Sequence, residues 1–205
     1  MKSVNRRINF VLGICLVFSF ACSSTMEPDP PDPVDGPTFA ELAAEGWTLF
    51  EAGNYASAVS KFQEAKNKDR GQVEGYVGLG WSHFKNGNTS SAISEFSFGN
   101  SQSGADADLF GGWAFALNAA QEYVDSNTQV DRALADNASW AFSHDSNIGA
   151  NDLTLLKAEN HFLLGNFSES LSVVQQLNTA FDADVSTSDG QSALAAEIER
   201  LQSAG

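Results

Sequence analysis

The sequence has very little cysteine and histidine, and each shortage argues against a class of site. Only two cysteines occur among 205 residues, Cys15 and Cys22, and both lie in the N-terminal segment. The domain that follows has no thiol for a disulfide, for nucleophilic catalysis or for a cysteine-based metal site. The three histidines form no His-x-x-x-His pair, so we expect no transition-metal site.

Positive charge is scarce as well. The chain has 11 lysines and arginines against 26 aspartates and glutamates, with a formal net charge of −15. Because lysine and arginine bind phosphates, this composition argues against a nucleic-acid partner. No glycine-rich phosphate loop and no nucleophile motif occurs either, so we expect no cofactor and no enzymatic activity.

The first 22 residues have the features of a targeting segment. Lys2, Arg6 and Arg7 form a basic start, and residues 8–21 are an apolar run that is too short to span a membrane comfortably as a permanent helix. Small residues then lead to Cys22. The sequence therefore predicts a signal segment over residues 1–22.

The end of this segment, Ser19-Phe20-Ala21-Cys22, resembles a bacterial lipoprotein processing site. The resemblance implies that Cys22 is acylated and becomes the mature N-terminus; an ordinary secretory signal cleaved nearby and an uncleaved anchor are the alternatives. Ser23 after the cysteine favours the outer membrane of a bacterial envelope. Residues 23–37 hold all five prolines and predict an extended tether of about 40 Å.

One stretch of the remaining chain, residues 38–205, occurs twice. Residues 46–62 read GWTLFEAGNYASAVSKF, and 34 residues later residues 80–96 read GWSHFKNGNTSSAISEF, with nine identical positions. A 34-residue unit built as helix, turn and helix is typical of tetratricopeptide repeats. Thr38-x-x-Glu41 is a capping box that marks where the first helix begins.

Both copies resemble the tetratricopeptide repeat family closely. In the second copy the family's positions are occupied by Tyr76, Leu79, Gly80, Gly87, Ala92, Phe96 and Gly99. Two departures are Glu45, where the family has leucine, and Arg70, where it has a closing proline. The small residues predict a close approach of the two helices in each pair.

Weaker signals extend the pattern to the C-terminus. Gly112-Trp113 follows Gly80-Trp81 after 32 residues, which predicts a third hairpin from helices over 105–120 and 126–140 with an unusually long turn. Residues 143–150 follow as a polar loop. A fourth hairpin is predicted over 152–164 and 168–177, and a terminal helix over 191–203. The fold class is therefore all-α: a tetratricopeptide-like α-solenoid of about four hairpins plus a C-terminal capping helix.

The resemblance also implies a candidate binding site. In this family the first helix of each pair lines a concave groove, where the residue after the repeat glycine and the one three further on usually face the ligand. These are aromatic here, namely Trp47, Phe50, Trp81, Phe84, Trp113 and Phe162. Exposed aromatics would suit a peptide, a helix or sugar rings. The alternative is that they are buried under a neighbouring helix or under the C-terminal helix.

We therefore expect a lipid-anchored scaffold that binds a partner protein or peptide through this groove in a bacterial envelope. A lipoprotein that captures a glycan or peptide for an uptake system is the second hypothesis. The sequence does not identify the partner.

Overall fold

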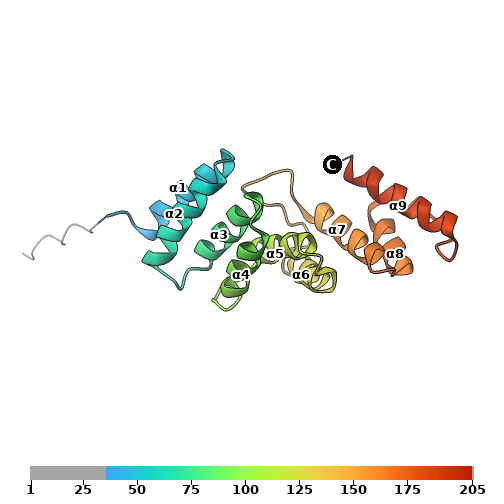
Figure 1. Ribbon diagram of the computed structural model, residues 1–205, viewed down its shortest axis with the longest axis horizontal. Helices are drawn as coiled ribbons and strands as arrows, with labels where there is room; N and C mark the ends of the chain where they lie inside the picture. The colour runs from blue at the N-terminus through green and yellow to red at the C-terminus, as the bar shows by residue number, and fades with distance from the viewer. Residues whose placement is uncertain (1–35, 205) are drawn as a thin grey trace, which may run out of the picture. The chain divides into compact units, whose positions relative to one another are not determined.

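The structure, a computed structural model, describes residues 36–204, and in that range the chain forms nine α-helices (Figure 1). The predicted signal segment, Cys22 and most of the tether lie outside the described residues. The helices are α1 (Phe39–Glu51), α2 (Tyr55–Lys68), α3 (Val73–Lys85), α4 (Thr89–Gly99), α5 (Ala107–Ala119), α6 (Tyr123–Asp136), α7 (Ala150–Leu163), α8 (Phe167–Leu177) and α9 (Ser188–Gln202). None of these helices has the length and apolarity that a membrane span requires.

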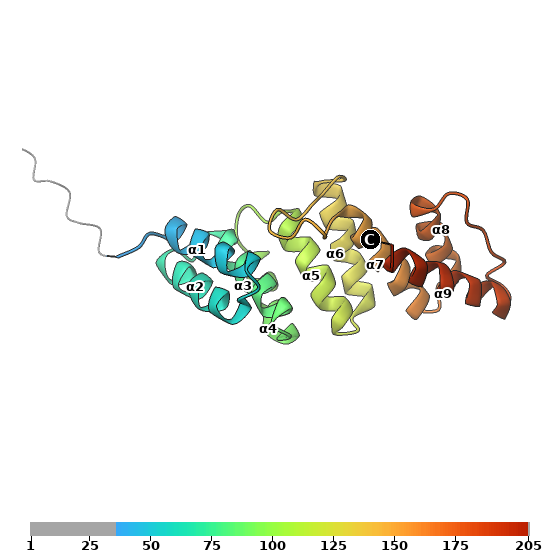
Figure 2. The same ribbon diagram turned by 90° about the horizontal axis from the view of Figure 1, so that it is seen from above.

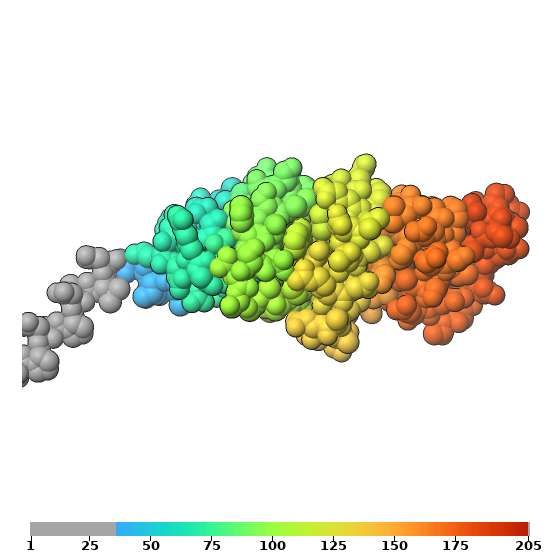
Figure 3. Space-filling view, turned by 90° about the horizontal axis from the view of Figure 1, so that it is seen from below, coloured from blue at the N-terminus to red at the C-terminus, as the bar shows by residue number. Residues whose placement is uncertain are grey.

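The helices pack as four consecutive hairpins followed by a single helix. Each hairpin packs on the next, and α9 packs on α7 and α8 (Figure 2). The first helices, α1, α3, α5 and α7, follow one another and form what we call the inner face. Figure 3 shows the opposite side of the molecule. Its colours follow the chain order, so each repeat on this side lies next to the repeat that precedes or follows it in the sequence. The predicted all-α solenoid of four hairpins with a terminal helix is confirmed.

The repeat glycines allow the two helices of a hairpin to approach closely. A Cβ on Gly80 would lie 2.5 Å from the ring of Phe96, and a Cβ on Gly46 would lie 2.9 Å from the ring of Phe62. Both phenylalanines are fully buried. Glycine destabilises a helix interior by up to about 1 kcal/mol relative to alanine, and here its small size is what admits the ring. The predicted capping box is also confirmed, since Thr38 and Glu41 bond each other's backbone at the start of α1.

All four hairpin turns have the same geometry. Each contains one residue with positive φ, between 64° and 80°, whose N–H donates to the carbonyl three residues earlier, while the next N–H donates to the carbonyl five residues earlier. The residues with positive φ are Gly53, Gly87, Gln121 and Gly165. The prediction of a longer third turn was therefore wrong. It failed because Gln121 stands where the other copies have glycine.

These turns also fix the true repeat register. The four residues follow one another at intervals of 34, 34 and 44 residues. The position of Gly80 thus recurs at Ala114 and not at Gly112. In the fourth copy it recurs at Ala158. Hydrogen bonds support this equivalence: the Ser126 hydroxyl donates to the carbonyl of Ala114, and the Ser170 hydroxyl donates to the carbonyl of Ala158, both at 2.8 Å and both across 12 residues. The longer final interval reflects a long connection between α6 and α7, residues 137–149.

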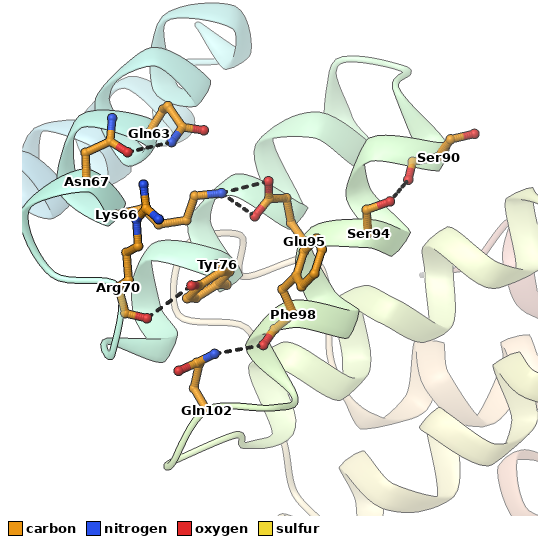
Figure 4. Close-up of polar contacts among 10 residues, drawn as sticks. All are labelled: Gln63, Lys66, Asn67, Arg70, Tyr76, Ser90, Ser94, Glu95, Phe98 and Gln102. Carbon is orange, nitrogen blue, oxygen red and sulfur yellow. Dashed lines mark hydrogen bonds and ion pairs between the residues drawn. The ribbon is translucent and has the colours of Figure 1, made fainter.

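Polar contacts link the first two repeats. Lys66 of α2 donates to both carboxylate oxygens of Glu95 of α4 at 2.8 Å (Figure 4). The hydroxyl of Tyr76 in α3 donates to the backbone carbonyl of Arg70 at 3.1 Å. These contacts hold the first two repeats together on the side away from the inner face.

Candidate functional site: the inner face and its inserted loop

The structure buries the aromatic residues of the first two repeats. Trp81 is fully buried, Phe50 is 2% exposed and Trp47 is 7% exposed. Phe84 is partly buried. The expectation of an exposed row is therefore wrong for Trp47, Phe50 and Trp81. Neighbouring helices supply part of their cover, since Trp81 packs on Phe96 of α4 and Phe115 of α5, and a further segment supplies the rest.

The further segment over these aromatic residues is the connection between α6 and α7, residues 137–149, which we call the inserted loop. Side chains alternate along it: Trp140 and Phe142 are buried and His144 is partly buried, while Ala141 and Ser143 are exposed. The loop folds back on itself: an antiparallel bridge joins Ala141 to Gly149, the N–H of Phe142 donates to the carbonyl of Ile148 at 2.9 Å, and the chain turns between Phe142 and Asp145. In both ribbon views the loop runs from α6 back over α5 towards the first repeats (Figures 1 and 2).

Aromatic stacking fixes the loop on the inner face. The Phe142 ring stacks on Trp81 with centroids 4.2 Å apart, and its edge packs on Trp47 and Phe50 at 6.0 and 5.9 Å. The His144 ring lies parallel to Trp47 with centroids 3.7 Å apart. Stacked and edge-on aromatic pairs contribute about 0.5–1.5 kcal/mol each beyond the burial of area. Three residues of the predicted row, Trp47, Phe50 and Trp81, thus contact a segment of their own chain.

Polar contacts hold the start and the tip of the loop. At its start, Trp140 Nε1 donates to Asp108 Oδ1 at 2.6 Å. Burial raises the pKa of the Asp108 carboxyl, and the Trp140 bond opposes the shift. Near the tip, Asp145 pairs with Lys85 at 2.9 Å, and His144 Nδ1 lies 2.8 Å from Glu51. The loop therefore joins α6–α7 to helices α1, α3 and α5.

The comparisons with known proteins bear on the fold. No protein-family model and no curated protein matches the sequence. Among solved structures, the chain resembles YrrB, described as a TPR protein with an unusual peptide-binding site, with a TM-score of 0.61 and 13% identity over 79% of this chain and 85% of YrrB. It also resembles TTC0263, a thermophilic TPR protein of Thermus thermophilus, with a TM-score of 0.54 and 12% identity over 80% of this chain and 81% of that one. The chain has the tetratricopeptide-repeat fold.

A third similar structure is MamA, with a TM-score of 0.58 and 13% identity over 67% of this chain and 70% of MamA. At these identities the likeness concerns the tetratricopeptide-repeat fold alone. The inserted loop must be understood from its own contacts.

The register of the tetratricopeptide-repeat fold corrects one predicted groove residue. Phe115, and not Trp113, is equivalent to Trp47 and Trp81, because Ala114 takes the position of Gly80. The Phe115 ring lies 6.1 Å from Trp81 and 6.4 Å from Phe84. Trp113 instead packs partly buried against the core, and its Nε1 has no hydrogen-bond partner among residues 36–204.

The inserted loop leaves part of the inner face of this tetratricopeptide-repeat fold open. Two adjoining hollows, of about 220 and 210 Å³, lie between α5, α7 and α9 and share Glu159 and Gln202. We call them together the C-terminal groove. Its lining residues are Phe115, Asp152, Leu155, Leu156, Glu159, Phe162, Leu163, Ala195, Ile198, Glu199 and Gln202. Of the predicted groove residues, Phe162 lines it.

Sequence reasoning missed the two features that shape this surface. Residues 143–150 were predicted to be a polar loop and Trp140 to end a helix, although Trp140, Phe142 and His144 place aromatic rings at every second position of this connection. Phe115 was missed because the Gly-Trp pair two residues earlier looked like the repeat.

In residues 36–204 no group of three or more histidine, cysteine or acidic side chains could hold a metal ion.

Proposed function

We propose that this chain is a lipid-anchored scaffold that binds a protein or peptide partner in a bacterial envelope through its inner face. The observation that supports it most is the inserted loop. The inner face already holds a turned segment of the chain whose alternate side chains, Trp140, Phe142 and His144, enter aromatic contacts. A surface that binds a peptide of its own chain has the shape and chemistry for peptide recognition.

The second hypothesis, glycan capture, needs exposed aromatic faces on which sugar rings can stack. The faces of Trp47 and Trp81 are occupied by His144 and Phe142. We therefore favour the scaffold, for which the remaining C-terminal groove supplies an open surface. That YrrB is described as having a peptide-binding site is consistent with this use of the fold.

Site-specific crosslinking in native membranes tests the partner. A photo-crosslinking residue at Leu155, in the C-terminal groove, should capture one protein or peptide reproducibly. The matched control is Val124, which is 63% exposed on α6 and lies outside that groove. Equal capture from both positions, or none from Leu155, would contradict the proposal.

The anchor is a separate part of the proposal and has its own test. The sequence around Cys22 supports acylation, and the proline-rich residues 23–37 support a spacer between membrane and domain. Cys22→Ser should abolish incorporation of a labelled fatty acid and move the protein out of the outer-membrane fraction. Cys15→Ser is the matched control, because Cys15 lies inside the predicted signal segment and should be dispensable for acylation.

A further inference from the structure

The inserted loop determines which part of the inner face is open to a partner. Through Phe142 it packs on Trp47, Phe50 and Trp81. Removing these aromatic contacts at once would be strongly unfavourable, because large apolar rings would be exposed to water. A partner must therefore use the C-terminal groove between α5, α7 and α9.

The floor of the C-terminal groove is apolar. Phe115 and Leu155 are partly exposed, and Leu156 lies between their hollow and the core. At the far end Leu163 is 50% exposed, which makes it one of the few large apolar side chains in the described range that remain open to solvent. Such a floor favours apolar side chains of a ligand over a purely polar one.

The walls of the groove carry negative charge without a counter-charge. Glu159 lies between the two hollows and Glu199 borders one of them, and neither hollow is lined by a lysine or arginine. Burial raises the pKa of the Glu159 carboxyl, whose one hydrogen bond comes from Gln202 Nε2 at 3.2 Å. A cation placed against this half-buried carboxylate would stabilise its ionised form.

The nearest basic side chains are already engaged elsewhere. Arg200 of α9 donates to both oxygens of Glu197, and Lys157 of α7 pairs with Asp131 of α6. The third acidic residue of the lining, Asp152, accepts the N–H of Gly149 at 2.8 Å. That donor is neutral and leaves the charge of Asp152 uncompensated as well; Glu159 and Glu199 are the two acidic residues that line the hollow between α7 and α9.

We propose that the C-terminal groove binds a cationic amphipathic segment of the partner. Its apolar side chains lie on Phe115 and Leu155, and its lysines or arginines lie against Glu159 and Glu199. This inference rests on the proposed scaffold function and adds the chemistry of the partner. Charge complementarity of this kind determines which partner binds and how fast it associates.

Three synthetic peptides test the inference directly. The full-length chain in phosphatidylcholine nanodiscs is titrated with three labelled peptides, with empty discs as blank. Two are amphipathic, one of lysine and leucine and one of glutamate and leucine, and the third, of lysine and serine, has no apolar face. We expect the lysine–leucine peptide to bind at least about tenfold more tightly than either of the others. Equal affinity of the lysine–leucine and lysine–serine peptides would contradict the apolar floor.

Matched variants separate this groove from general attraction to an acidic protein. Glu159→Gln with Glu199→Gln should weaken binding of the lysine–leucine peptide about tenfold. Glu122→Gln with Asp125→Asn removes the same charge from the exposed α5–α6 turn and the start of α6 and should change affinity less than about twofold. Equal losses in the two pairs would overturn the proposal, because the attraction would then come from net charge.

Failure of the cationic-segment inference can be distinguished from failure of the proposed scaffold function. Crosslinking of a partner from Leu155, together with no dependence on Glu159 and Glu199, overturns the cationic-segment inference and leaves the scaffold. Absence of both crosslinking and peptide binding overturns both. Circular dichroism of each variant checks that the helices are retained.

Discussion

At the scale of single residues, Trp81 shows how an aromatic at a groove position can belong to the core. Its ring is fully buried between Phe96 and Phe142, and its Nε1 donates to the carbonyl of Asp108 at 2.9 Å. Trp81→Ala removes this ring and leaves a cavity. We expect the free energy of unfolding to fall by about 3–5 kcal/mol, measured by urea denaturation.

The matched control for Trp81 is another aromatic truncation. Phe98 is 62% exposed on α4, on the surface shown in Figure 4. Phe98→Ala should change the free energy of unfolding by less than about 0.5 kcal/mol. Similar losses in the two variants would mean that Trp81 is not the core residue described here.

Glu197 gives a residue-scale prediction about pH. The Arg200 guanidinium and the Asn178 side-chain amide donate to its carboxylate and hold its pKa at about 2 instead of 4.5. Because the folded state favours the ionised form, the stabilisation is present above about pH 4.5 and is lost as the pH falls towards 2. Glu197→Gln should lower the free energy of unfolding at pH 7, and the difference from wild type should close as the pH approaches 2.

Urea denaturation at a series of pH values measures this effect. Glu199 lies two residues further along α9 and is exposed, so Glu199→Gln is the control. If the difference in the free energy of unfolding between wild type and Glu197→Gln stays constant from pH 7 to pH 2, the ionised carboxylate is not the origin of the lost stability.

At the scale of elements, the third hairpin turn retains the repeat geometry with an unfavourable residue. Gln121 has φ 64°, the conformation that glycine adopts at Gly53, Gly87 and Gly165. A side chain there is strained by about 1–2 kcal/mol, and part of the gain from glycine is offset by the flexibility of the unfolded chain. Gln121→Gly should therefore raise the free energy of unfolding by about 0.5–1 kcal/mol.

The reverse exchange supplies the control for this turn. Gly87→Gln places a side chain at φ 80° in a turn where the space around the Cβ is open, so backbone strain is the main change. It should lower the free energy of unfolding by about 1 kcal/mol. Thermal denaturation of the two single variants would show opposite shifts; shifts of the same sign would contradict the argument.

The same turns explain how far the sequence could predict the elements. Gly53-Asn54, Gly87-Asn88 and Gly165-Asn166 mark the ends of the helices in three copies, and these hairpins were located correctly. Gln121 obscured the third, and the register was consequently placed two residues early at Trp113. A local pattern locates a helix end when the turn contains glycine, the residue that adopts positive φ most readily, and it fails when another residue takes that conformation.

The inserted loop could not be predicted from local patterns, because its contacts are distant in the sequence. His144 and Glu51 are 93 residues apart, and Lys85 and Asp145 are 60 residues apart. The loop rings that these contacts hold in place complete the burial of Trp47 and Trp81, which neighbouring helices cover in part. That the inner face binds a partner stays a prediction, and which part of that face remains open to one could be read only from the structure.

At the scale of the described domain, the inserted loop adds contacts that an array of repeats lacks. In a solenoid each repeat contacts only its neighbours, and the ends open most easily. Here α1 is held by α2 and α3 and, in addition, by Phe142 and His144 of the loop. The loop should thus make the opening of the first hairpin depend on a segment between the third and fourth.

Phe142→Ala tests this coupling by hydrogen exchange. Loss of the ring removes its contacts with Trp47, Phe50 and Trp81, which corresponds to about 3–5 kcal/mol for a buried phenylalanine. Protection of the amides in α1 and α2 should fall far more than in α8 and α9, which the loop does not contact in the aromatic cluster. Ser143→Ala, at the adjacent exposed position of the loop, should leave both unchanged. A uniform loss over all helices would indicate that the domain opens as one unit, and unchanged protection of α1 would show that the loop does not hold the first hairpin.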